Sequence, residues 1–74
     1  MFTFHVADAH EFGRAIRAWR AGLGLTQEQL AEVIGVNRRV IGELERGKGS
    51  VRLEIALAAA RAVGLDAELH RRSR

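Results

Sequence analysis

Apolar residues recur every three or four positions through most of this chain, which is the spacing of amphipathic helices. A first helix is predicted over about residues 9–23, begun by Asp8 with Glu11 three residues later. Its apolar stripe comprises Phe12, Ile16, Trp19 and Leu23. At this spacing Trp19 fits a core position, with a partner-binding role as the alternative. A last helix is predicted to end at Gly64 and to pack over the others through Leu53, Ala56, Leu57, Ala60 and Val63.

Residues 25–49 have the pattern of two short helices separated by a tight turn. Thr26 caps the first of them and Gly35 ends it, and its apolar side comprises Leu30, Ala31 and Ile34. Asn37 caps the second, whose apolar residues are Val40, Ile41 and Leu44. Two helices joined by a short turn containing Gly are typical of a helix-turn-helix. The second helix opens with Arg38 and Arg39, where a DNA-reading helix places side chains that contact bases.

The two ends of the chain instead alternate apolar and polar residues, which favours short strands. Phe2–His5 is predicted to be either a strand or a frayed terminus, and residues 65–71 a half-buried strand. A lone strand needs a partner, which here is either Phe2–His5 or the same segment of a second chain. A disordered tail is the alternative. The prediction is one domain over 1–74, with an arm or strand at 1–7, a helical core at 8–64, the strand at 65–71 and a basic tail at 72–74.

Composition narrows the class of protein. Seventy-four residues form a single small core, which oligomerisation often supplements. The absence of Cys excludes disulfides and Cys-based zinc sites and fits a cytoplasmic protein, and neither a signal peptide nor a membrane span is visible in the sequence. The net charge is +3, and residues 37–52 carry a local excess of the same size. The position of the charges therefore matters more than their sum, and the excess lies around the predicted second helix, whose expected partner is double-stranded DNA.

No arrangement of residues predicts catalysis. The three His are scattered without a second ligand at metal-binding spacing, and each Ser or Thr is explained as a cap or tail residue. Residues 47–50 (GKGS) lack the preceding strand and the earlier Gly of a phosphate-binding loop. We therefore expect no catalytic residue, no metal and no cofactor, and not an enzyme.

The segments LTQEQLA, IGVNRRVI and LERGKG resemble, in order and spacing, the helix-turn-helix of the Cro/C1 (XRE) repressor family. The resemblance implies a mainly α, lambda-repressor-like domain of four to five helices. It implies base contacts by Arg38, Arg39 and Glu43, although an i, i+4 pair with Arg39 is an equal alternative for Glu43. Expected contacts to the DNA backbone are Thr26, Gln27, Asn37, Arg46, Lys48 and Arg52.

Two further residues, Arg20 and Glu45, match a pair that ties the first helix to the end of the recognition helix in this family. Gly42 departs from the larger residue usual at its position and lowers helix propensity by roughly 1 kcal/mol. A close approach of a neighbouring backbone or of DNA is one reason for such a glycine, and the sequence alone does not decide between them.

The alternating segment after Gly64 resembles the HipB-type antitoxin branch of the family. That resemblance implies a homodimer in which Leu65, Ala67 and Leu69 pair across the two-fold axis. It also implies a repressor of a palindromic operator in a toxin–antitoxin operon, and a HipA-type kinase toxin as partner. The alternatives are a stand-alone repressor without a toxin, and a protein-interaction module that only neutralises a partner.

Overall fold

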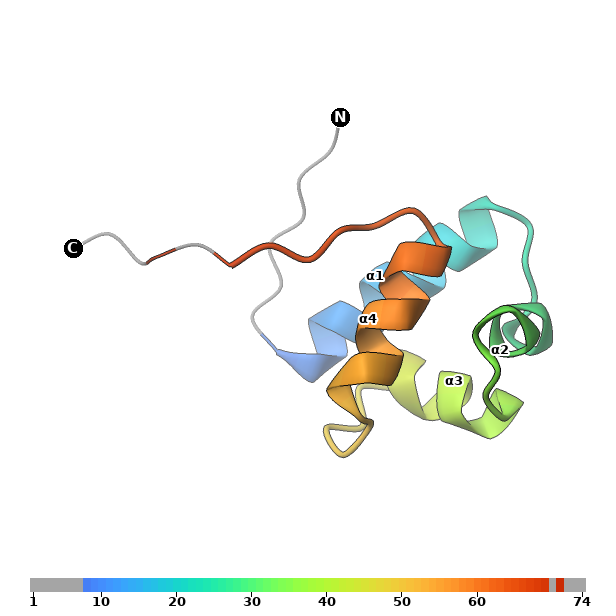
Figure 1. Cartoon of the computed structure of the whole chain (residues 1–74), viewed down its shortest axis with the longest axis horizontal. Helices are drawn as coiled ribbons and strands as arrows, with labels where there is room; N and C mark the ends of the chain where they lie inside the picture. Colours follow the sequence, from blue (N-terminus) through green and yellow to red (C-terminus); the bar gives the residue numbers. More distant parts are fainter. Residues whose placement is uncertain (1–7, 70, 72–74) are drawn as a thin grey trace.

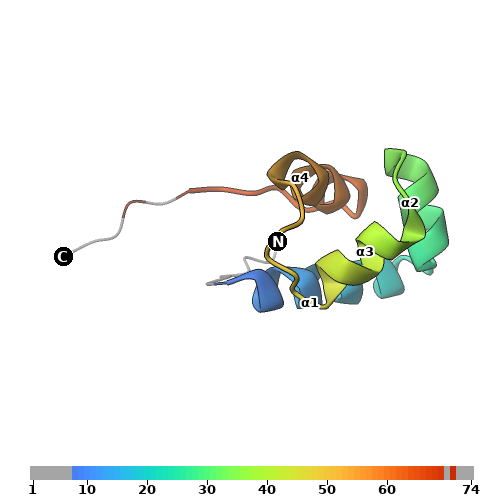
Figure 2. The same ribbon diagram turned by 90° about the horizontal axis from the view of Figure 1, so that it is seen from below.

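The computed structural model describes residues 8–69 and 71, and these contain four helices: α1 (Ala9–Gly22), α2 (Gln27–Ile34), α3 (Arg38–Glu45) and α4 (Leu53–Ala62) (Figure 1). Helices α1 and α3 lie side by side in one layer and α4 forms a second layer. Helix α2 lies at one end, where it packs against both α3 and α4 (Figure 2). This is the mainly α, helix-turn-helix architecture that the sequence predicts.

Each of the first three helices begins where a polar side chain satisfies a free backbone N–H group. Asp8 Oδ1 accepts from the Glu11 amide at 2.9 Å. Thr26 and Gln29 form a reciprocal capping box, in which each side chain accepts a hydrogen bond from the other residue's amide. Asn37 Oδ1 accepts from the Arg39 amide at 2.8 Å. The bounds of α2 and α3 are therefore fixed locally by their own sequence.

The core is aliphatic and lies between the two layers. Its largest fully buried side chains are Ile16, Leu30, Ile41 and Val63, one from each helix or its end. Phe12 and Trp19 are half-buried against this cluster, which confirms the core position expected for Trp19. Burial of each large aliphatic side chain contributes about 1.5–3 kcal/mol to the free energy of folding, so this cluster is a main stabilising contribution to the packing of the helices.

Two apolar residues expected in the core are exposed instead. Leu23 is 56% exposed because α1 ends at Gly22, so Leu23 falls in the turn and leaves the apolar stripe of the helix. Leu53 is 72% exposed because it is the first residue of α4 and precedes the part of that helix that contacts the core. Periodicity alone does not show that the packed part of each helix stops short of these positions.

Helices α1 and α3 approach each other closely at Gly13. A Cβ atom added to Gly13 would lie 2.4 Å from the carbonyl oxygen of Leu44 and 2.7 Å from that of Glu45. Any side chain there would collide with backbone, which cannot rotate away. The missing side chain of Gly13 therefore sets the distance between α1 and the end of α3.

The chain after α4 leaves the helical body in an extended path (Figure 1). Leu65 packs against the core, and its amide donates to the Ala60 carbonyl at 2.8 Å. Leu69, in contrast, is fully exposed. Residues 65–69 form no strand within this single chain, and strand pairing with a second chain stays a prediction. The segment Phe2–His5 lies outside the described residues.

Within the described residues, none of the four helices has the length and apolar content needed to cross a membrane.

We expect Gly13→Ala to lower the free energy of unfolding by about 1–3 kcal/mol, the usual cost of overpacking against groups that cannot move. Gly22→Ala is the matched control, since Gly22 lies in the same helix and a Cβ there meets nothing within 4 Å. Urea denaturation followed by circular dichroism measures both. Equal stabilities of the two variants would contradict the proposed close contact.

Candidate nucleic-acid interface

The turn between α2 and α3 orients the second helix relative to the first. It consists of residues 35–37, and Gly35 adopts a left-handed conformation with φ of 76°. The amide of Val36 donates to the Ala31 carbonyl at 2.9 Å, and the Val36 side chain packs against the core. Helix α3 can then begin immediately at Arg38. The two helices and their turn form the helix-turn-helix predicted from the sequence.

A buried polar cluster fixes the far end of α3. Arg20 binds the Glu45 carboxylate through both of its oxygens, with Nε to Oε2 at 2.6 Å and Nη2 to Oε1 at 3.0 Å. Its Nη1 donates to the Leu25 carbonyl at 2.7 Å. Gln27 Nε2 donates to Glu45 Oε1 at 3.0 Å. The Glu45 carboxylate therefore joins α3 to α1 and α2, and Arg20 adds the α1–α2 loop to the same network.

The two charged side chains of this cluster are largely buried, which is unfavourable unless they are paired. The Glu45 side chain is only 3% exposed, and that of Arg20 only 13%. The hydrogen bond to Glu45 raises the pKa of Arg20 above its ordinary value, so the guanidinium stays charged at any accessible pH. A carboxylate at a helix C-terminus is unfavourable for the helix dipole. The guanidinium compensates for both the burial and the position of Glu45.

The outer face of α3 is basic and open. Arg38 and Arg39 occupy the first two positions of the helix and both are exposed, while Ile41 and Leu44 face the core. In the described part of the chain, neither guanidinium takes part in an ion pair. Their donors are therefore available, and a guanidinium can bond both major-groove acceptors of guanine.

Glu43, one turn beyond Arg39 on the same face, is bonded by a different residue from the one expected. Lys48 Nζ donates to Glu43 Oε2 at 3.0 Å, in place of the i, i+4 pair with Arg39. This hydrogen bond, supported by the nearby charges of Lys48, Arg39 and Arg46, lowers the pKa of Glu43. A lowered folded-state pKa means that the pair contributes stability above the unfolded-state pKa. That contribution is lost as the pH falls through the folded-state pKa. Because this pKa is lowered, Glu43 is a carboxylate at neutral pH.

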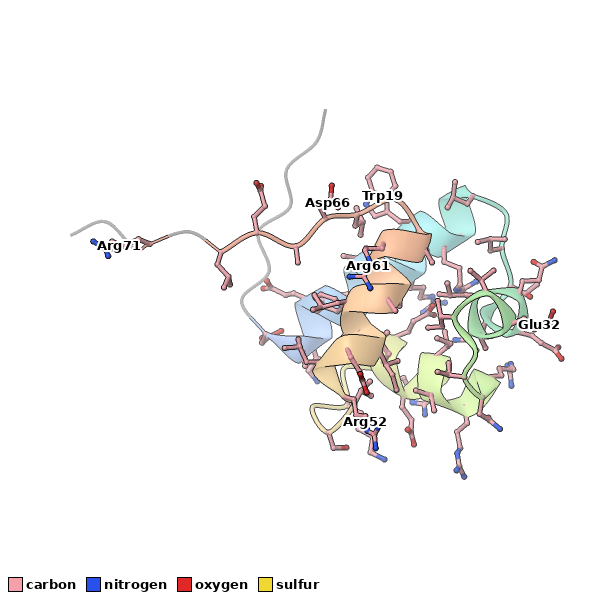
Figure 3. All side chains as sticks on the ribbon, viewed as in Figure 1. Trp19, Glu32, Arg52, Arg61, Asp66 and Arg71 are labelled. Carbon is pink, nitrogen blue, oxygen red and sulfur yellow. The ribbon has the colours of Figure 1, made fainter. Side chains whose placement is uncertain are left out.

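The remaining candidates for backbone contacts divide into two groups. Thr26 and Asn37 cap the two helices with exposed side chains, and the hydroxyl proton of Thr26 is still free to donate to a phosphate. Arg46 is exposed as well. Arg52 extends outward at the start of α4 and forms only an exposed pair with Glu54 at 3.3 Å (Figure 3). Gln27, in contrast, is half-buried and its amide nitrogen is bonded to Glu45.

Sequence reasoning missed two groups that shape this surface. Gly13 was not singled out, although a glycine inside a helix that needs no kink can indicate close helix packing. The carbonyl of Leu25, which accepts from Arg20, could not have been found, because a backbone atom has no signature in the sequence.

The geometry suits binding of a polyanion. Cationic side chains lie along the outside of α3 and the loop after it, and the helix that carries them is held rigidly from behind. Among the described residues, no group of three or more His, Asp or Glu could hold a metal ion. The arrangement provides charge and hydrogen-bond donors on a convex helix, which is how a helix-turn-helix meets a major groove.

Comparisons with known proteins agree with this geometry. A family model described as "Helix-turn-helix" matches residues 16–69. An uncharacterised HTH-type transcriptional regulator of Methanothermobacter thermautotrophicus is 53% identical over 51 residues, which is 69% of this chain and 74% of that protein. Among solved structures, one described as "Structure of HipA-HipB-O2-O3 complex" has a chain that matches with a TM-score of 0.85 at 20% identity. Another, described as "HipB-O4 20mer complex", gives the same values, and each match covers 96% of this chain and 100% of the other.

The chain therefore belongs to the helix-turn-helix family of DNA-binding transcriptional regulators of the XRE type. This family binds DNA and is not one of enzymes. The likeness to the HipB chains is a likeness of fold, since the identity is low.

We expect Arg20→Ala to destabilise the protein by about 3–5 kcal/mol, because it leaves the buried Glu45 carboxylate without its cation. Arg14→Ala, on the exposed side of the same helix, should change stability by less than about 0.5 kcal/mol. Arg20→Lys should lose more stability than Arg14→Ala, since an ammonium cannot reproduce the three bonds of the guanidinium in their planar arrangement. Thermal and urea unfolding measure all three. A similar loss in Arg14→Ala would show that the cluster has no special role.

Proposed function

We propose that this chain is a homodimeric transcriptional repressor that binds a palindromic operator in the cytoplasm, and that it is the antitoxin and autorepressor of a HipBA-type toxin–antitoxin operon. The observation that carries the DNA-reading part is the pair of exposed guanidinium groups at the start of α3, neither of which forms an ion pair with any residue that the structure describes. The dimer and the toxin partner are proposals with separate support.

The reading roles follow from position on the helix. Arg38 and Arg39 contact base edges, where a bidentate Arg–guanine pair contributes about 1–3 kcal/mol of discrimination. Glu43, on the same face, accepts from a cytosine amino group or orients its basic neighbours. Lys48 and Arg46 contact phosphates, as do Thr26, Gln27, Asn37 and Arg52 around them. For Lys48 this requires exchange of its bond to Glu43 for one to a phosphate.

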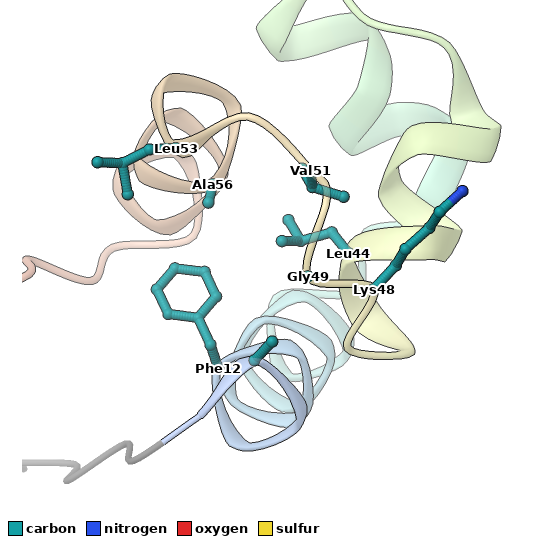
Figure 4. Close-up of a pocket in the computed structure, with 8 residues that line it drawn as sticks. Phe12, Leu44, Lys48, Gly49, Val51, Leu53 and Ala56 are labelled. Atoms are coloured by element: carbon teal, nitrogen blue, oxygen red, sulfur yellow. The ribbon is translucent and has the colours of Figure 1, made fainter.

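A dimer is supported by what one helix can read. A single recognition helix covers only a few base pairs, so specificity needs a second copy at about 34–36 Å. Apolar groups suited to such an interface are exposed. Leu69 and Ala67 are exposed on the extended segment after α4, whereas Leu65 is half-buried against the core of the same chain. An apolar pocket of about 300 Å³, lined by Phe12, Val51, Leu53 and Ala56 among others, lies between α1 and α4 (Figure 4).

The toxin partner is supported by the fold alone. The HipB chain that this fold matches is described as part of a complex with HipA. Co-expression with the product of the neighbouring reading frame, followed by purification of a stable complex, tests this part. Failure to form a complex, with DNA binding intact, would favour a stand-alone repressor. A complex without DNA binding would favour an interaction module.

Base-reading and phosphate-contacting residues should respond differently to a change of DNA sequence. We expect Arg38→Ala and Arg39→Ala to lose affinity for the upstream operator while keeping most of their binding to scrambled DNA. Lys48→Ala should weaken both DNAs alike and reduce the slope of log affinity against log salt by about 0.9. Gel-shift titrations over a range of salt concentrations measure this. If the three variants behave alike on both DNAs, the assigned roles are wrong.

The proposed dimer can be tested by replacing Leu69, a side chain that is not packed against its own chain. Leu69 is fully exposed, so Leu69→Asp should leave the folded monomer intact and halve the mass in solution. Leu23→Asp, at an exposed apolar residue after α1, serves as the control and should remain dimeric. Truncation after Gly64 should have the same effect as Leu69→Asp. Light scattering gives the masses, and an unchanged dimer after truncation would remove the proposed interface.

A further inference from the structure

Gly42 occupies an unusual place on the DNA-facing helix. It lies four residues after Arg38 and four before Arg46, and it is buried, whereas both arginines are exposed. A Cβ atom added to Gly42 would lie 3.2 Å from Nη1 of Arg46 and 3.9 Å from Oε1 of Gln27. The Nη1 end of Arg46 therefore lies tightly against the place of the missing Cβ, and Gln27 Oε1 lies at ordinary contact distance from it.

Helix geometry brings Arg46 to this place. Side chains on a helix tilt toward its N-terminus and cover the residue four positions earlier, and Gly42 is four positions before Arg46. In the part of the chain that the structure describes, no carboxylate lies within ion-pair distance of the Arg46 guanidinium. The exposed guanidinium lies with its Nη1 close to Gly42, and among the described residues its N–H donors are not used in an ion pair.

Gln27 lies on the other side of the place that a Cβ of residue 42 would occupy, which we call the seat of the Arg46 guanidinium. Its Nε2 is bonded to Glu45, which Arg20 holds in turn, so the amide is anchored to the buried cluster. The opposite end of the amide, Oε1, is then the end nearest Gly42. Gln27 Oε1 and Arg46 Nη1 thus both lie within 4 Å of the place that a Cβ of residue 42 would occupy.

We propose that Gly42 is a positioning residue for DNA binding: its missing side chain seats the Arg46 guanidinium against α3 beside Gln27, in place to bind a DNA phosphate next to the bases that Arg38 and Arg39 read. A glycine inside a helix lowers its stability, so the position gives up stability in exchange for the placement of a cation. The inference rests on the DNA-binding function of the chain. It differs from a simple need for space, because the atoms that a Cβ would meet belong to flexible, polar side chains and not to backbone.

The test uses four proteins in a double-mutant cycle: the wild type, Gly42→Ala, Arg46→Ala and the double variant. Each is titrated with a mixed-sequence duplex of about 20 base pairs between about 50 and 200 mM salt, since a phosphate contact is independent of sequence. Circular dichroism gives the melting temperature of each protein. Gly22→Ala is the control, because it also replaces a helical glycine but meets nothing within 4 Å.

Stability and affinity should change in opposite directions. We expect Gly42→Ala to raise the melting temperature by about 2–6 °C, through helix propensity, while lowering the DNA affinity by a factor of roughly 3–10. Arg46→Ala should lose more affinity and reduce the salt slope by about 0.9. The double variant should bind no more weakly than Arg46→Ala, since the seat has nothing left to hold. Gly22→Ala should bind like the wild type.

Other results would overturn the inference in distinct ways. An unchanged or higher affinity of Gly42→Ala would show that the guanidinium needs no seat. An equal further loss when the Arg46 side chain is absent would show that Gly42 faces the DNA itself. A wild-type protein with no salt-dependent binding to any duplex would overturn the DNA-binding function, a result that is separate from both.

Discussion

The structure depends on the burial of one carboxylate. Glu45 ends the recognition helix in a position where neither the low dielectric of the core nor the helix dipole favours its charge. Arg20 makes that charge acceptable, and in doing so it joins α1, the following loop and α3 through one guanidinium. Gln27 extends the same network to α2. Because breaking one partner of a buried ion pair is costly, the network ties the end of α3 to α1 and α2 in addition to the apolar packing.

Most of the architecture could be predicted because its signals are local. Capping residues such as Thr26 and Asn37 and the left-handed Gly35 mark where helices begin and end, and the apolar periodicity marks which side faces the core. The bonds of Glu43 could not be predicted, since the choice between Arg39 and Lys48 depends on the path of the loop after α3. Leu23 and Leu53 were misplaced because periodicity does not show where the packed part of a helix stops: Leu23 falls just after α1, and Leu53 is the exposed first residue of α4.

The candidate DNA-binding surface separates two tasks. Residues that hold α3 in place, above all Glu45 and Ile41, face inward, and residues that would meet DNA face outward. Gln27 lies between the two groups, because it is half-buried, its amide nitrogen is bonded to Glu45 and its oxygen lies near Gly42 and not at the exposed face. For this reason its role could not be read from its position at the start of α2. Its other neighbours, Gly42 and Arg46, come from the next helix.

The close crossing at Gly13 has a consequence for how such a protein diversifies. Helix α3 meets α1 through backbone atoms at that point, near the C-terminal end of α3. The side chains at positions 38 and 39 lie at the opposite end of the helix and are exposed. Substitutions there leave the core unchanged and, under the proposed reading roles, alter the DNA sequence that is bound. Position 13, in contrast, accepts no side chain, so a glycine without any chemical group of its own is among the residues of the domain that are hardest to replace.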